Sequence, residues 1–128
     1  MPNKAVNTND APAPIGPYSQ AVKAGPMLFI SGQIALIPGT DNIANETVAA
    51  ETSQVMNNLR AILREANMDF GDVVKTSIFL SDMSLFSEVN EEYTKYFTGN
   101  YPARETVAVK GLPKNVNVEI SMIAFRES

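Results

Sequence analysis

Several polar side chains of this chain fall at positions where the pattern predicts a buried strand or helix face. Arg104 opens a strand-like segment, and Thr106 points the same way two residues later. Glu119 stands between two apolar residues of another strand-like segment. If these two segments pair, the arginine and the glutamate could converge as the charged centre of a site. The structural alternative is a cross-strand or interface ion pair.

Four further residues could complete such a site. Asn90 falls on the apolar stripe of a predicted helix, where an amide is unusual, and Tyr18 ends a Gly-Pro-Tyr segment. Ser31 lies on a predicted strand beside Gly32, whose missing side chain lets another group approach the backbone. Each also has a purely structural interpretation, as a satisfied buried amide, a bulge or ordinary packing.

Two absences restrict the chemistry. The chain contains no cysteine and no histidine. Disulfides, thiolate metal sites, zinc sites of the usual kind and a Ser-His-Asp triad are therefore excluded within one chain. An enzyme of this composition must move protons through a carboxylate, a tyrosine, a lysine or positioned water. We expect no metal in the site.

The charge balance bears on the binding partners, and the distribution of apolar segments bears on the location. Ten basic and fourteen acidic residues give a net charge of −4, and the lysines are scattered. Nucleic acid is therefore not expected as the main partner. The N-terminus lacks an apolar segment of signal-peptide length, and no window has the length and apolarity of a membrane span. These features predict a cytoplasmic protein that does not enter a membrane.

The elements that must position these residues form one predicted domain, residues 1–128, with an extended Pro- and Ala-rich arm at 1–14. Period-two alternation predicts strands, and steps of three, four and seven predict helices. The predicted strands span 19–24, 27–35, 72–80, 104–110 and 116–125, and the predicted helices span about 46–66 and 85–97.

Local signals support these helices. Asn45 or Thr47 could cap the start of the first helix, and Asn67 suits a left-handed position at its end. In the second helix, Glu91 is expected to pair with Lys95 one turn later.

The order of the elements predicts the fold class. Strands and helices interleave, but the first two strands and the last two strands each resemble a hairpin. The prediction is an α+β fold, a mixed β-sheet with two α-helices on one face. The other face of the sheet then lacks cover, which predicts an oligomer.

Five segments resemble, in order, the RidA family of enamine/imine deaminases, also called YjgF or UK114. The resemblance extends from about Ala11 to Ala124. It implies a chorismate-mutase-like fold and a homotrimer around a central β-barrel, with clefts at the subunit interfaces that draw residues from two chains. The segments are APIGPYSQAV, FISGQIA, FLSDMSLFSEVNEEYTKYF, PARETVAV and LPKNVNVEISMIA.

The resemblance also implies an activity. Members of the family hydrolyse reactive 2-enamine and 2-imine intermediates, such as 2-aminoacrylate and 2-aminocrotonate, to 2-keto acids plus ammonia. The reaction prevents damage to pyridoxal-phosphate enzymes and uses no cofactor. On this resemblance, Arg104 is the catalytic arginine that holds the substrate carboxylate, since a guanidinium offers a matching bidentate fork. Glu119 matches the acidic residue that positions or deprotonates water, or passes protons to the departing nitrogen.

The remaining residues match positions of the family's substrate pocket. Tyr18, Ser31 and Asn90 are the matching side chains, and Gly32 contributes its backbone. Thr106 stands where many relatives carry cysteine, so a thiol-dependent role at this position is excluded here. Its hydroxyl can still bind substrate.

Two other functions stay open. One is a regulatory module that binds a 2-keto acid without turnover, and the other is a translation inhibitor with endoribonuclease activity, against which the acidic balance counts. The sequence leaves undecided which imine and which pathway are served. It also leaves undecided which subunit contributes each residue of the cleft, and whether Glu119 acts directly or through water.

Overall fold

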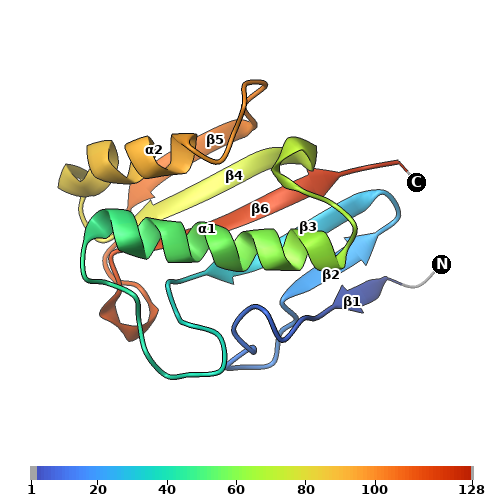
Figure 1. The fold of residues 1–128 in the computed structure, drawn as a ribbon, viewed down its shortest axis with the longest axis horizontal. Helices are drawn as coiled ribbons and strands as arrows, with labels where there is room; N and C mark the ends of the chain where they lie inside the picture. The colour runs from blue at the N-terminus through green and yellow to red at the C-terminus, as the bar shows by residue number, and fades with distance from the viewer. Residues whose placement is uncertain (1–2, 128) are drawn as a thin grey trace.

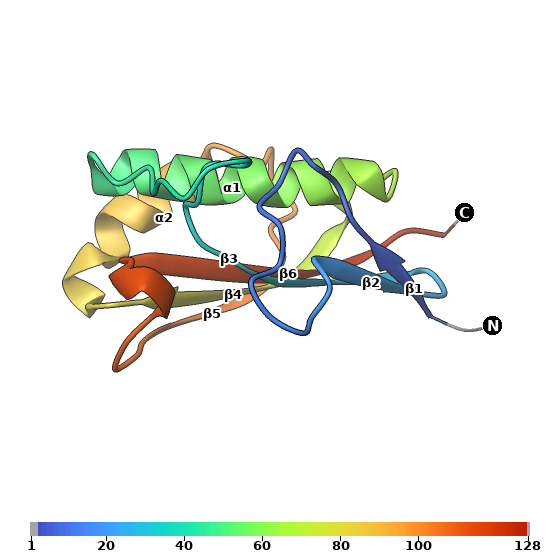
Figure 2. The ribbon, with the colours of Figure 1, turned by 90° about the horizontal axis from the view of Figure 1, so that it is seen from below.

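A six-stranded mixed sheet carries two α-helices on one face, in a computed structural model that describes residues 3–127 (Figures 1 and 2). The predicted fold class, α+β with both helices on one face, is confirmed. The elements are β1 (Lys4–Val6), β2 (Ala21–Ala24), β3 (Met27–Gln33), α1 (Val48–Glu65), β4 (Val73–Leu80), α2 (Phe86–Thr94), β5 (Ala103–Ala108) and β6 (Val118–Phe125).

The strands are arranged in the order β1-β2-β3-β6-β4-β5. All neighbours are antiparallel except β4 and β5, which are parallel and are connected through α2 (Figure 1). The prediction that the last two strands pair is wrong, because β4 lies between them. A strand–helix–strand connection places β5 beside β4. The alternately buried β6 takes the centre of the sheet, and the more exposed β5 takes the edge.

The ends of the helices follow the capping signals in most respects. Thr47, and not Asn45, is the N-cap of α1, and its hydroxyl accepts from the backbone N–H of Ala50 at 3.0 Å. Asn67 after α1 has a φ of 60°, as predicted. The second helix is shorter than predicted, and Lys95 pairs with Glu92 at 3.0 Å in place of the expected Glu91.

A β-bulge interrupts β3 just before the predicted site. Ile30 pairs with Met122, but Gln33 pairs with Ile120, so one extra residue is inserted on β3. Strict alternation along β3 would place Gln33 on the same face as Phe29, and the bulge breaks this pattern. The bulge turns Gln33 to the helix-covered face, where it is buried.

The N-terminal arm is more ordered than an extended tail. Its residues Lys4–Val6 form the edge strand β1, and the buried side chain of Gln20 holds the segment that follows. The Gln20 amide nitrogen donates to the carbonyl oxygens of Thr8 at 3.0 Å and Pro12 at 2.8 Å. Its amide oxygen accepts from the Thr8 N–H at 2.7 Å. One side chain therefore fixes the course of the arm beside β3.

The hydrophobic core lies between the helices and the sheet, and the opposite face of the sheet is bare (Figure 2). On this open face Phe29 is 45% exposed, Val107 43% and Phe125 40%. The uncovered face predicted from the element order is therefore present. Within the described residues, no helix is both long and apolar enough to cross a membrane. The fully buried side chains of the core include Leu28, Met56, Leu59, Ile62, Leu63, Ile78, Leu80 and Ile120.

Candidate active site

The predicted site residues fall into two groups on opposite faces of the sheet. Arg104 pairs with the fully buried Thr76 of β4, so its side chain points to the face covered by the helices. Glu119 alternates with buried residues of β6 and points to the open face. We call the residues Arg104, Thr106 and Asn90 the arginine group, and the residues Tyr18, Ser31, Gly32 and Glu119 the glutamate group.

Arg104 lies under α2 and forms no internal ion pair. Its guanidinium carbon is 5.1 Å from the ring centroid of Tyr93 and 5.7 Å from that of Phe86. No carboxylate lies within 4.0 Å of its nitrogens among residues 3–127. The guanidinium therefore keeps its charge and its donors for an external anion, and a planar carboxylate matches it best.

Two polar side chains accompany the arginine. The Thr106 hydroxyl is buried and has no hydrogen-bond partner in the described structure. Asn90 lies between Phe86 and Tyr93 on one stripe of α2, so it faces the same space as Arg104. A buried hydroxyl normally has a partner, and a bound ligand would supply one for Thr106.

Glu119 approaches the backbone at the bulge in β3. A Cβ atom at Gly32 would lie 2.9 Å from the carboxyl carbon of Glu119, closer than side chains tolerate. Gly32 is therefore required for this close approach, and not for a left-handed backbone angle. Burial raises the pKa of Glu119 above its ordinary value. A carboxyl group that holds its proton more tightly is better suited to accept and return protons near neutral pH.

The space around Glu119 is a narrow pocket of about 70 Å³. Tyr18, Gly32 and Glu119 line it together with the N-terminal arm, and none of its lining residues is a lysine or arginine. The arm contributes apolar walls that the sequence analysis did not assign to the site. The only signal in the sequence was the clustering of prolines, which holds this segment extended. The lining residues from this part of the chain are Pro12 and Ala13 of the arm and Ile15 directly after it.

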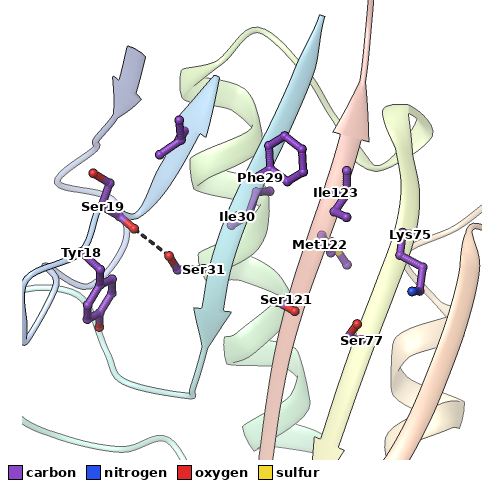
Figure 3. A pocket seen from close by; sticks show the side chains of 11 residues that line it. Tyr18, Ser19, Phe29, Ile30, Ser31, Lys75, Ser77, Ser121, Met122 and Ile123 are labelled. Carbon is purple, nitrogen blue, oxygen red and sulfur yellow. Dashed lines mark hydrogen bonds between the residues drawn. The ribbon is translucent and has the colours of Figure 1, made fainter. Parts of the chain in front are cut away.

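Tyr18 also borders a second, wider pocket on the open face, of about 380 Å³ (Figure 3). Phe29, Ser31 and Lys75 line this pocket from β3 and β4. The Ser31 hydroxyl donates to the carbonyl oxygen of Ser19 at 2.7 Å, drawn as the dashed line in Figure 3. Its hydrogen is thus used within the chain, and only its lone pairs remain for a ligand.

The expectation that Arg104 and Glu119 converge through strand pairing is wrong, and so is a cross-strand ion pair between them within one chain; an ion pair across an interface stays a prediction. β4 separates their strands, and the side chains leave the sheet on opposite faces. The acidic residue of β5 that does form an ion pair is Glu105, whose carboxylate contacts Lys75 at 2.8 Å on the open face. Within one chain, the arginine group and the glutamate group lie on opposite faces of the sheet and do not share a cavity.

The sequence analysis also missed the role of two aromatic residues of α2. Phe86 and Tyr93 belong to the apolar stripe of this helix, and both rings contact the Arg104 guanidinium. The signal in the sequence was that Phe86 and Tyr93 lie seven residues apart on one helix stripe, with the amide of Asn90 between them. It became informative only once the helix was known to cover β5.

Comparison with known proteins finds extensive similarity. The model of the family described as endoribonuclease L-PSP matches residues 8–126. The 2-iminobutanoate/2-iminopropanoate deaminase of Mus musculus is 46% identical over 123 residues, which cover 96% of this chain and 91% of that protein. The structure of the YjgF gene product from E. coli superposes with a TM-score of 0.92 at 42% identity, covering 97% of this chain and 99% of that chain. E. coli TdcF with bound serine gives the same TM-score and the same coverages at 38% identity.

Proposed function

Because the chain belongs to the endoribonuclease L-PSP family, which includes the YjgF/RidA proteins, we propose that it hydrolyses 2-imino acids and their enamine tautomers to 2-keto acids and ammonia. The observation that carries this proposal is the Arg104 guanidinium, which is fixed under α2 without an internal anion. Beside it lies a buried hydroxyl without a partner, that of Thr106. Such a site suits a small planar carboxylate.

The second half of the site comes, in this proposal, from a neighbouring copy of the chain. The glutamate group faces away from the arginine group, so a cleft between two copies brings them together. We propose a homotrimer in which the open faces of the sheets meet around a central barrel. The exposed apolar residues Phe29, Val107 and Phe125 support an interface on that face.

The proposed reaction needs only groups of this chain and water. Arg104 binds the carboxylate, and Thr106 and Asn90 orient the rest of the substrate. Water adds to the imine carbon and forms the new C–O bond, while Glu119 of the adjoining copy takes one of the protons of the water. The same carboxyl group returns this proton to the nitrogen, which gives a carbinolamine. It then takes the proton of the new hydroxyl and delivers it to the amine nitrogen, so that the C–N bond breaks, the keto group forms and ammonia leaves. Orientation and charge placement account for the acceleration.

The test couples the protein to a threonine dehydratase and follows the formation of 2-oxobutanoate from the released imine. The wild type should accelerate the step from imine to keto acid over buffer. Charge-assisted hydrogen bonds contribute about 1.5–3 kcal/mol each, so Arg104→Ala should lower kcat/KM by roughly 10²–10³-fold while remaining a folded oligomer. The matched control is Arg64→Ala, which removes an exposed arginine of α1 that pairs with Asp69.

Three outcomes decide between the functions. No acceleration by the wild type would refute the enzymatic proposal. Keto-acid binding that depends on Arg104 without turnover would identify a regulatory module instead. RNA binding whose affinity falls steeply with salt would favour the endoribonuclease named in the family description. A net charge of −4 predicts few phosphate contacts and therefore a weak dependence of affinity on salt.

A further inference from the structure

The guanidinium of Arg104 is held by aromatic rings. Its central carbon lies 5.7 Å from the ring centroid of Phe86 and 5.1 Å from that of Tyr93. The two residues are seven positions apart on α2, which separates them by about 10 Å along the helix axis. The guanidinium is therefore within cation–π distance of both rings, on the helix stripe to which Asn90 belongs.

The ring of Tyr93 is itself fixed by a hydrogen bond to the sheet. Tyr93 is 3% exposed, and its hydroxyl donates to the hydroxyl of the fully buried Thr76 at 3.0 Å. Thr76 is the cross-strand partner of Arg104 in the parallel pair β4–β5. The bond therefore links the ring to the strand position directly beside the arginine. Burial raises the pKa of the Tyr93 phenol, with the Thr76 bond and the Arg104 charge acting against it, so the hydroxyl remains a donor at neutral pH.

This arrangement differs in its effect from an ion pair. A carboxylate beside Arg104 would hold it but would also occupy its N–H donors and neutralise its charge. The face of an aromatic ring attracts the cation and leaves the N–H groups at the edge of the guanidinium plane free. An arginine that must recognise a carboxylate ligand is better oriented by rings than by an acid.

We infer that Tyr93, held by Thr76, is a positioning residue that sets the orientation of the Arg104 guanidinium for carboxylate binding. The inference rests on the proposed function, since it assigns a role in the same site. Binding of the carboxylate is needed in the ground state and in the transition state alike. Loss of the orientation should therefore raise KM more than it lowers kcat.

The first experiment removes the hydrogen bond between Tyr93 and Thr76 by substituting each partner in turn. Tyr93→Phe and Thr76→Val should each raise KM in the coupled assay about three- to tenfold, leave kcat within about twofold, and raise the Kd for pyruvate by the same factor as KM. The double variant should be no worse than the more affected single variant, because both substitutions remove one shared contact. The matched control is Tyr96→Phe, which removes a hydroxyl that bonds to Ser53 at 2.8 Å and leaves Arg104 untouched.

The second experiment measures the order of the guanidinium directly and needs no turnover. The ¹⁵Nε–H signal of Arg104, assigned by its loss in Arg104→Lys, should report a rigid group in the wild type. In Tyr93→Phe, Thr76→Val and Tyr93→Leu the group should become mobile on the ps–ns timescale. If Tyr93→Leu does not fold, the other two variants still decide the question.

The outcomes separate this inference from the proposed function. Folded variants with unchanged KM, unchanged pyruvate affinity and an unchanged Arg104 signal would overturn the positioning role, as would a loss of thermal stability without any of these changes. A wild type that turns over no imine, with Arg104 mobility still increased in the variants, would refute the deaminase proposal and leave the positioning role standing.

Discussion

At the scale of single residues, the most informative group is the Glu119 carboxyl. Burial alone raises its pKa, and the pocket around it holds no lysine or arginine among the described residues to oppose that effect. The raised pKa extends the pH range in which the group can carry a proton. The same burial makes the ionised form costly for the folded state.

The pH dependence of the reaction should reflect this group. The acid limb of kcat/KM should follow the protonation of Glu119, because the carboxylate must be ionised to take a proton from water. Burial raises the midpoint of this limb above 4.5, the ordinary value for a glutamate, and the Arg104 guanidinium that the proposed cleft brings near Glu119 acts in the opposite direction. Glu119→Gln should lose this limb together with most of the activity. A limb that persists unchanged in Glu119→Gln would show that another group sets the pH dependence.

The pH dependence of the free energy of unfolding independently checks that the pKa of Glu119 is raised in the folded chain. Below the unfolded pKa both states are protonated and the group contributes nothing. Between that value and the raised folded pKa, the unfolded chain loses its proton first, so the free energy of unfolding falls as pH rises. Glu119→Gln should remove this fall and become more stable than the wild type at neutral pH, as measured by urea unfolding from about pH 4 to pH 8.

The close approach at Gly32 leads to a second prediction at this scale. In Gly32→Ala the added methyl group would meet the Glu119 carboxyl, and the flexible side chain would move before the backbone does. We expect kcat/KM to fall by roughly 10²-fold with little change in thermal stability. Steady-state kinetics and thermal unfolding check this, and activity retained in full would mean that the position of Glu119 is not critical. Gly71→Ala is the control, since nothing lies within 4 Å of a Cβ there.

At the scale of elements, α1 anchors the start of the strand that carries Glu119. The fully buried carboxylate of Glu51 accepts from the backbone N–H groups of Asn117 at 2.8 Å and Val118 at 3.2 Å. It also accepts from the Asn117 side-chain amide at 2.9 Å. One helix side chain thus determines where β6 begins.

Removal of this anchor should be costly. Glu51→Ala leaves two backbone N–H groups without their acceptor, and we expect the free energy of unfolding to fall by about 3 kcal/mol. Urea unfolding at matched protein concentration measures the change. Glu46→Ala, at an exposed position before α1, should change it by less than about 0.5 kcal/mol, and equal effects of the two substitutions would contradict the anchoring role.

The types and approximate ends of the main elements could be predicted from the sequence, because periodicity and caps are local signals. Thr47 and Asn67 marked the first helix, and alternation correctly placed Arg104 and Thr106 on one face of their strand. The order of the strands could not be predicted, since pairing depends on contacts far apart in the chain. The convergence of Arg104 with Glu119 within one chain was inferred from the wrong strand order, and that prediction failed for this reason.

At the scale of the whole molecule, one face of the sheet remains to be covered. The side chains of Phe29, Val107 and Phe125 are each 40% or more exposed on it. Isolated apolar residues are common on surfaces, but several on one flat face favour association. The proposed trimer would cover this face and complete the clefts in a single step.

Placing a charge on this face should therefore dissociate the oligomer. Val107→Asp should shift the protein from a three-chain species toward single chains in sedimentation equilibrium, and imine turnover should fall with it. The control is Ala49→Asp, on the exposed side of α1, which adds the same charge on the layer opposite the open face. A three-chain species that survives Val107→Asp would refute an interface at this part of the face.

The placement of Arg104 and Glu119 on opposite sides of β4 has a genetic consequence. Two inactive alleles, one lacking the guanidinium and one lacking the carboxyl group, would each still encode the half that the other has lost. Co-expressed, they should rescue one another: random mixing in a three-membered ring leaves about a quarter of the interfaces with both groups intact. If the two alleles never complement, the arginine and the carboxyl group of one active site must come from the same chain.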